Sequence, residues 1–332
     1  MRKLALRNIK LTLQDPKYLS VTATFLALIL LPFLVSEAYF LHLMILSIVF
    51  GISASSWDIT MGYCGIFNFS HMTFFGVAAY ASAILSKTFG MSPWISMLLG
   101  ALFAVLASLL CGLPSLRLSG VYIAMFTLLF MQLVGLFVLF DPFGLTNGPS
   151  GIQHVPPLSV GPINFGGLNK IPNYFFALMI LTVTVTTLHK ILKSSIGLAL
   201  RAVRDNENLA MARGINPNKY KMISWVISAF FNGLAGAFYV HYNQVATIEI
   251  FSFILVAQVL SYLVVGGLGT LYGPIIGSFF MTFLSEQLRG IAGYRLLIFA
   301  ISIILIAQFA RGGLYHLVQI FFAKIQGQRR VA

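Results

Sequence analysis

A few residues in otherwise apolar stretches have side chains that could move protons or bind ions. They are Asp58, His71, His241 and Glu286, with Arg289 three positions after Glu286. Carboxylates and histidines inside a membrane are costly, and they commonly mark ion pathways. Two ordinary explanations stand beside this one. Glu286 and Arg289 could neutralise each other across one helical turn, and His71 could be a hydrogen-bonded residue of a helix bundle.

A second polar group directly follows a pair of glycines and consists of Asn68, Ser70 and His71. In a straight helix residues 68 and 71 share one face, whereas Ser70 is displaced from it. We predict that Asn68 and His71, together with the nearby Asp58, face a path through the protein. We expect the Ser70 hydroxyl to bond a neighbouring backbone carbonyl instead.

The other reactive residues form no pattern typical of catalysis or metal binding. Cys64 and Cys111 lie in apolar surroundings without metal-ligand spacing, and we interpret both as packing residues. The sequence contains no Gly-Lys pair, so it lacks the phosphate-binding loop that carries a lysine. We therefore predict no enzyme activity, no metal site and no bound cofactor in this chain. Uphill transport would need an ion gradient or an energy-supplying partner.

Composition and hydropathy predict the secondary structure that carries these residues. The 332 residues are 58% hydrophobic and 9% charged, with a mean hydropathy of +0.91. A hydrocarbon core of about 30 Å needs apolar runs of roughly 17 to 25 residues, and an open chain can cross it only as helices. We predict an all-α integral membrane protein with about ten spans, at 18–35, 39–57, 66–85, 93–111, 120–140, 172–191, 222–242, 251–268, 273–288 and 294–310.

The distribution of lysine and arginine predicts the orientation. With ten spans and a cytoplasmic N-terminus, 17 of the 21 basic residues face the cytoplasm, as does the C-terminus. The connection 141–171 then lies outside and holds a single basic residue. The net charge of +13 is explained by topology and by contact with anionic lipid, so it does not indicate nucleic-acid binding.

One polar segment, residues 190–221, holds nine of the 29 charged residues. We predict a short helix over 198–204 and a second one to Arg213, capped by Asp205 or Asn206. Gly214 suits a left-handed stop, and Pro217 prevents continuation. A basic loop that only fixes topology is the simpler interpretation, but the capping and stop signals favour a structured surface for a partner.

Backbone-breaking residues gather in two places, and we predict helix breaks there. They are Gly62 and Gly65, then Gly266, Gly267, Gly269, Gly273, Pro274 and Gly277. The spacing of the last glycines also favours close helix packing, and both interpretations can hold together. Interrupted helices are typical of transport pathways, since irregular backbone at membrane depth needs protein or water to satisfy it.

Several motifs now point to a known family. They read GYCGIFNFSHMTFFGVAAY at 62–80, RLSGVYIAMFTL at 117–128, LTNGPSGI at 145–152, SSIGLALRAVRDNENLAMARGINPNKYK at 194–221 and GGLGTLYGPIIG at 266–277. In order and spacing the chain resembles, along nearly its whole length, the permease subunits of ATP-binding-cassette (ABC) importers for branched-chain amino acids. Each glycine motif alone is weak.

The resemblance implies that residues 197–214 dock on a cytoplasmic ATPase. It assigns this coupling role to Gly197, Arg201, Ala202, Arg204, Asp205, Asn206, Glu207, Ala210 and Gly214. It also implies an inner-membrane location, two ATPase subunits that bind ATP and Mg²⁺, a second homologous permease and a periplasmic solute-binding protein. Within this scheme residues 1–17 and the amphipathic tail 311–332 are cytoplasmic, and 18–310 form one permease domain.

The solute that the resemblance implies is leucine, isoleucine or valine. The chain departs from the family pattern at Asp58, where asparagine is usual, and at residues 68–70, which read Asn-Phe-Ser. Importers of urea, short amides or other amino acids are therefore alternatives. A secondary carrier driven by an ion gradient is the alternative of another class, and it should depend on a buried carboxylate.

Overall fold

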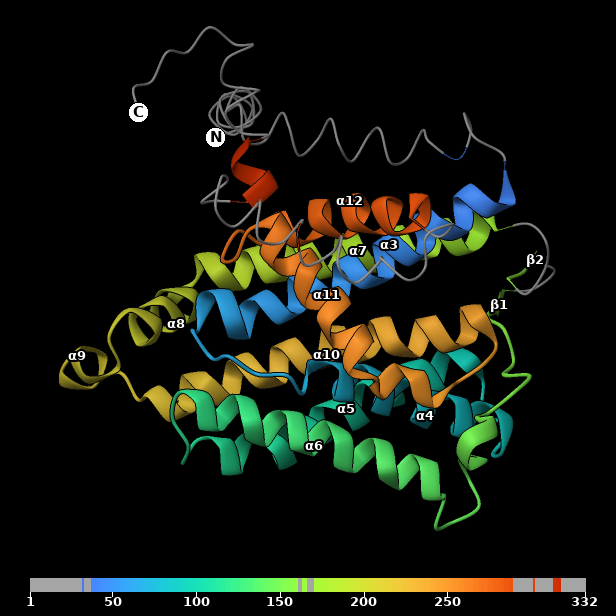
Figure 1. Ribbon diagram of the computed structural model, residues 1–332, viewed down its shortest axis with the longest axis horizontal. Helices are drawn as coiled ribbons and strands as arrows, with labels where there is room; N and C mark the ends of the chain where they lie inside the picture. The colour runs from blue at the N-terminus through green and yellow to red at the C-terminus, as the bar shows by residue number, and fades with distance from the viewer. Residues whose placement is uncertain are drawn as a thin grey trace, which may run out of the picture.

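Eight helices of 14 to 27 residues make up most of the computed structural model (Figure 1). The structure describes residues 32, 37–160, 163–165, 170–288, 301 and 313–317. The eight helices are α3 (Ala38–Asp58), α4 (His71–Lys87), α5 (Pro93–Ser115), α6 (Val121–Phe140), α7 (Ile171–Lys193), α10 (Pro217–Asn243), α11 (Phe253–Gly266) and α12 (Gly273–Gln287). The prediction of an all-helical fold is confirmed.

Five of the described helices are long and apolar enough to cross a membrane. They are α3 with its continuation to Tyr63, α5, α6, α7 and α10. The helices α4, α11 and α12 are shorter, at 17, 14 and 15 residues. Apart from Pro32 and Ile301, the predicted spans 18–35 and 294–310 lie outside the described residues, as do segment 1–17, Arg289 and most of the predicted tail. The total of ten spans stays a prediction.

Close helix packing depends on glycine. The central helix α10 packs against α4, α5 and α3, while α12 packs on α3 and α11. A side-chain carbon at Gly236 of α10 would overlap the backbone carbonyl of Phe75 in α4, and one at Gly277 of α12 would overlap that of Tyr262 in α11. Small residues allow this approach, which favours helix association in lipid. The packing role of Gly277 is confirmed, but its predicted role as a break is wrong because it lies inside α12.

The two polar connections lie at opposite ends of the helices (Figure 1). At one end are α8 (Ser195–Asp205) and α9 (Glu207–Ala212). At the other end the α6–α7 connection forms a minimal antiparallel pair of β1 (Ser159–Val160) and β2 (Ile163–Asn164). Short 3-10 turns lie at Gly148–Ser150 and Ile248–Phe251. This separation agrees with the predicted placement of the two connections on opposite sides of a membrane.

The α6–α7 connection is ordered by the carboxylate that begins it. Asp141 has a φ of 46° and accepts the backbone N–H groups of Leu145, Thr146 and Asn147 at 2.7 to 2.9 Å. These donors, with that of Thr146 foremost, hold the pKa of Asp141 below its ordinary value, because they stabilise the ionised form. Further along, Ile152 pairs with Ala246 beyond the end of α10.

Two helices begin about five residues away from their predicted starts. The helix α4 begins at His71 rather than near residue 66, because residues 64–70 leave the helix through Gly65 at a φ of +76°. The helix α10 begins at Pro217 rather than 222. There Asn216 accepts the N–H of Lys219 at 3.3 Å, and Pro217 stands in the first turn, where its missing N–H costs nothing. Thus Pro217 lies in the first turn of α10, whereas α9 already ends at Ala212.

Candidate functional site

The first helix of the polar segment, α8, turns directly off the end of α7. Ser194 caps it, because its hydroxyl oxygen accepts the N–H of Ile196 at 3.2 Å. Gly197 permits the turn, since a side chain there would overlap the backbone of Leu192. One face of α8 is buried and consists of Gly197, Ala199, Leu200 and Val203. The helix is therefore fixed on the bundle by its apolar face.

The second helix, α9, has only six residues and carries a signal at each end. Asn206 caps its start by accepting the N–H of Leu209 at 3.0 Å. Gly214 follows its end with a φ of +81°, a left-handed conformation that glycine adopts without a side-chain clash. An ion pair of 2.8 Å between Glu207 and Lys221 joins α9 to α10. The predicted cap and stop are both confirmed.

The α8–α9 hairpin exposes apolar side chains among its charges. Leu198, Leu209 and Met211 are 63%, 54% and 50% exposed. Beside α9 the surface is hollowed, and the lining residues are Glu207, Met211, Gly214, Ile215, Asn216, Pro217 and Asn218. Exposed apolar residues at a polar end of a protein are typical of a surface that receives a partner.

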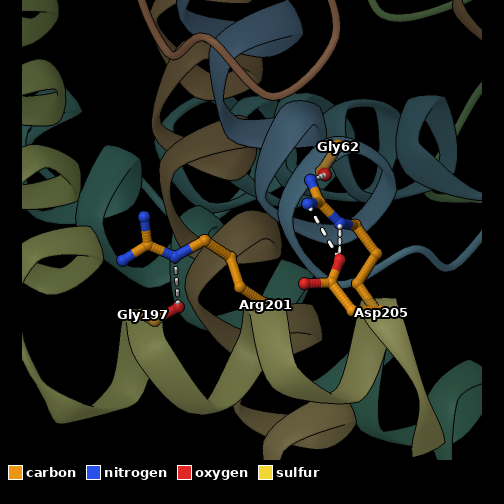
Figure 2. Close-up of polar contacts among 5 residues, drawn as sticks. Gly62, Gly197, Arg201 and Asp205 are labelled. Atoms are coloured by element: carbon orange, nitrogen blue, oxygen red, sulfur yellow. Dashed lines mark hydrogen bonds and ion pairs between the residues drawn. The ribbon is translucent and has the colours of Figure 1, made fainter.

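Two arginines of α8 make different contacts (Figure 2). Arg201 bonds within its own region, donating from Nε to the carbonyl oxygen of Gly197 at 3.2 Å. Arg204 reaches out of the hairpin and donates from Nη1 to the carbonyl oxygen of Gly62 at 2.8 Å. Its Nε and Nη2 atoms bond Asp205 at 3.1 and 3.0 Å. Arg204 thus connects the hairpin to the end of α3.

The other residues that the family resemblance assigns to coupling differ in burial. Ala210 is buried and Ala202 is partly buried, so these two alanines pack on the inner side of the hairpin. Asp205, Asn206 and Glu207 are exposed. Asp205, Asn206 and Glu207 can therefore contact another subunit, as can the exposed apolar side chains of the hairpin.

The first glycine-rich region ends α3 in two stages. The helix passes at Ile59–Tyr63 into a π-helical turn that contains Gly62, and the chain then becomes irregular at Gly65. Such turns are rare and occur often at functional sites. The turn packs against α8 and α10.

The second glycine-rich region separates α11 from α12. The helix α11 ends at Gly266, and Gly267 and Gly269 follow with φ values of +116° and +72°. The helix α12 begins at Gly273 with Pro274 in its first turn. We name residues 267–272 the glycine loop. Its backbone donors meet Asp58, whose carboxylate is fully buried and accepts the N–H of Gly269 at 2.7 Å.

His71 lies in a buried network of hydrogen bonds. Its Nε2 atom is 3.1 Å from Ser56 Oγ and 3.1 Å from the carbonyl oxygen of Ser53, and its Nδ1 atom is 3.3 Å from Ser228 Oγ in α10. Its ring stacks on Trp57 at a centroid distance of 5.2 Å. This geometry matches the interpretation of His71 as a hydrogen-bonded residue of a helix bundle.

Asn68 has a different environment. Its side chain is 1% exposed, and neither of its polar atoms has a hydrogen-bond partner among the described residues. Its backbone carbonyl accepts the indole N–H of Trp57 at 3.1 Å. Within the described ranges the Ser70 hydroxyl bonds no backbone carbonyl, so the prediction for it is wrong. Buried polar atoms without partners are costly, which distinguishes Asn68 from an ordinary packing residue.

The remaining candidates of the ion-pathway hypothesis are held by neighbours. His241 is buried and lies 2.8 Å from Ser82 Oγ and 2.7 Å from the carbonyl oxygen of Pro156. The Tyr39 hydroxyl donates to Glu286. Both predicted packing cysteines are free and buried.

Some contacts at these sites escaped sequence reasoning. The network of His71 includes Ser228 and Asn232 of α10, whose amide donates to the His71 carbonyl. A run of serines at Ser53, Ser55 and Ser56 in an apolar span was an available signal of buried polar packing. Nothing in the local sequence indicated that Arg204 would contact α3.

Long apolar helices with an ordered polar hairpin at one end, and with helices broken at glycine, define a polytopic membrane permease. Residues 39–307 match the family described as "Branched-chain amino acid transport system / permease component". The chain belongs to this family and is a transport subunit of the inner membrane rather than an enzyme.

Individual relatives agree with this assignment. The chain is 26% identical over 287 residues to the high-affinity branched-chain amino acid transport system permease protein LivM of Escherichia coli K12, covering 80% of this chain and 67% of the relative. It is 24% identical over 229 residues to the probable branched-chain amino acid transport permease protein LivH of Methanocaldococcus jannaschii, covering 67% of this chain and 70% of the relative. The nucleoside ABC transporter permease protein NupC of Lactococcus lactis is 29% identical over 189 residues, which are 53% and 58% of the two chains. No solved structure gives a significant match.

Proposed function

We propose that this chain is a permease subunit of a binding-protein-dependent ABC importer and that it translocates leucine, isoleucine or valine. The α8–α9 hairpin supports this proposal most strongly, because it is a capped, rigidly anchored surface with exposed apolar side chains at one end of the helices. Two cytoplasmic ATPase subunits that bind ATP and Mg²⁺ would dock on it. A second permease and a periplasmic binding protein complete the proposed machine.

The solute is assigned from the names of two relatives, which specify branched-chain amino acids. A third relative is named for nucleosides, so permeases of this kind differ in what they carry. Urea, short amides and other amino acids are alternatives within the same mechanism. The test is uptake of labelled leucine, isoleucine, valine, urea and a nucleoside by proteoliposomes that hold the assembled transporter and its binding protein. Saturable, ATP-dependent uptake of the first three alone supports the assignment, and uptake of another solute in their place contradicts it.

We also propose that Asn68 and His71 face the translocation route. The Asn68 amide, which has no hydrogen-bond partner in the described part of the chain, supports this role, since such a group can bond a passing solute or water. The test compares Asn68→Leu and His71→Leu in transporters that still assemble and hydrolyse ATP. Uptake should fall while hydrolysis continues. Normal uptake and solute preference in both variants would make these residues part of the packing only.

A further inference from the structure

Both oxygens of the buried Asp58 carboxylate accept hydrogen bonds from the glycine loop. Asp58 is 0% exposed, and its two oxygens accept the backbone N–H groups of Gly269 at 2.7 Å and Leu271 at 3.2 Å. Such bonds to an ionised acceptor are among the stronger hydrogen bonds in proteins. A carboxylate can accept at both positions, whereas an amide would place an N–H₂ group against one of the two donors.

The glycine loop needs an external restraint of this kind. Gly267 and Gly269 adopt positive φ values, and Leu271 does so at +54° although it carries a side chain. A non-glycine residue in this region is strained and keeps its conformation only where its surroundings impose it. Asp58 binds the loop on both sides of Thr270. The Asp58 carboxylate therefore holds the glycine loop in a strained conformation, which the loop would leave without these two hydrogen bonds.

Gly62, in the π-helical turn that follows Asp58, lies against the same carboxylate. A side-chain carbon at Gly62 would overlap both Asp58 Oδ1 and the amide nitrogen of Gly269. The π-helical turn, the carboxylate and the glycine loop are thus packed without space for one methyl group. Displacement of one of them has to displace the others, because close-packed interiors transmit strain.

Arg204 joins this cluster to the α8–α9 hairpin. Its Nη1 atom donates to the carbonyl oxygen of Gly62 at 2.8 Å (Figure 2), and the same atom lies 3.6 Å from the position that a side-chain carbon of Gly269 would occupy. The Arg204 guanidinium is therefore next to the glycine loop as well as bonded to Gly62. A movement of α8 would therefore be transmitted to the glycine loop by the Arg204 side chain.

We infer that Arg204, Gly62 and Asp58 form a relay that transmits movement of the α8–α9 hairpin to the glycine loop, with Asp58 as the positioning residue. This inference rests on the proposed function, since the movement would come from the ATPase subunits. It gives Asp58 a role distinct from lining the translocation route, because both of its oxygens are engaged by the loop. The loop is the connection through which α11 and α12 would change their relative position.

The test uses the whole transporter, reconstituted with its ATPases, second permease and binding protein. Asp58→Asn should leave ATPase association intact, while leucine transported per ATP hydrolysed should fall about tenfold, since it replaces a charge-assisted acceptor with a misplaced donor. Ser278→Ala is the matched control. It removes a buried hydrogen bond of 2.9 Å from α12 to the Ser47 carbonyl of α3 without touching the loop, and it should behave like the unmodified protein.

Equal coupling ratios for Asp58→Asn and Ser278→Ala would overturn the inference while leaving the proposed function in place. An unmodified transporter that shows no ATP-driven uptake of any solute tested would overturn both. These two failures are distinguishable, because the second appears before any relay residue is changed.

A second measurement covers the case in which Asp58→Asn does not assemble. Leu268 lies in the glycine loop and is 47% exposed, so Leu268→Cys in a protein without its native cysteines can report on the loop. Its labelling rate with a maleimide should differ several-fold between nucleotide-free and vanadate-trapped transporter. Arg204→Lys keeps the charge but loses the forked geometry, and in complexes that still bind the ATPases it should abolish this difference. Equal labelling rates in the nucleotide-free and vanadate-trapped states of the protein that retains Arg204 would contradict the relay.

Discussion

The short helix α9 should depend on its Asn206 cap far more than a long helix depends on an equivalent cap. Six residues are too few for a helix to be stable alone in water, so the bond from Leu209 N–H to Asn206 Oδ1 at 3.0 Å has a large share in forming α9. Replacing an asparagine cap by alanine costs about 1 kcal/mol. If the ATPase binds only the folded hairpin, Asn206→Ala should weaken ATPase binding by up to about fivefold, because 1.4 kcal/mol corresponds to tenfold and the full cost appears when α9 forms only on binding.

The assay is titration of the purified permease complex in detergent with the ATPase subunits. Asn206→Asp keeps an acceptor for the same N–H and should bind like the unmodified protein. Ser252→Ala removes the corresponding cap from α11, which has 14 residues and is packed in the bundle away from the hollow beside α9, so it should change ATPase binding little. Equal weakening by Asn206→Ala and Asn206→Asp would refute the capping argument, and so would unchanged binding in Asn206→Ala.

Three further predictions concern topology, packing and pH. Single cysteines at the exposed Asn147 and Asn208, in a protein without its native cysteines, should react with an impermeant thiol reagent from opposite sides of the membrane; labelling of both from one side would contradict the predicted orientation. Gly236→Ala forces a methyl group against the Phe75 carbonyl and should destabilise the protein by about 1 to 3 kcal/mol, lowering the Tm in detergent, whereas an unchanged Tm would show that α10 and α4 separate freely. The pKa of Asp141 is lower in the folded protein than in the unfolded chain, so the carboxylate stabilises the α6–α7 connection above the unfolded pKa. This stabilisation is lost as pH falls below about 4. Amide exchange in the connection, corrected for the intrinsic rate, should therefore rise on acidification. Corrected exchange that does not change with pH in the unmodified protein, or that shows the same pH dependence in the unmodified protein and in Asp141→Asn, would contradict this role of Asp141.

Local signals in the sequence were sufficient for much of the fold. Apolar runs of membrane length predicted the long helices because burial in lipid requires them, and each described helix begins and ends within about six residues of the predicted run. Caps act within three residues of themselves, so a cap at Asp205 or Asn206 and a stop at Gly214 could be predicted from sequence, and the structure shows the cap at Asn206. The start of α10 at Pro217 was missed because apolarity alone set the predicted boundary, although Asn216 was present as a cap.

Contacts between distant segments could not be predicted in the same way. Asp58 and Gly269 are 211 positions apart, and their hydrogen bond exists because α3 packs on α11 and α12. Arg204 and Gly62 are separated by 142 positions. A glycine pattern indicates that backbones approach closely, but it does not identify which backbones meet. The partners of Asp58 and Arg204 therefore became visible only in the folded chain.

We propose that this permease takes its energy from partner ATPases through the α8–α9 hairpin. The most direct measurement is accumulation of labelled leucine in proteoliposomes under two conditions. We predict that the assembled transporter with ATP on the hairpin side accumulates leucine without any ion gradient, and that the purified chain alone does not accumulate it under a proton or sodium gradient. Accumulation by the chain alone, driven by either gradient and unaffected by ATP, would contradict the account.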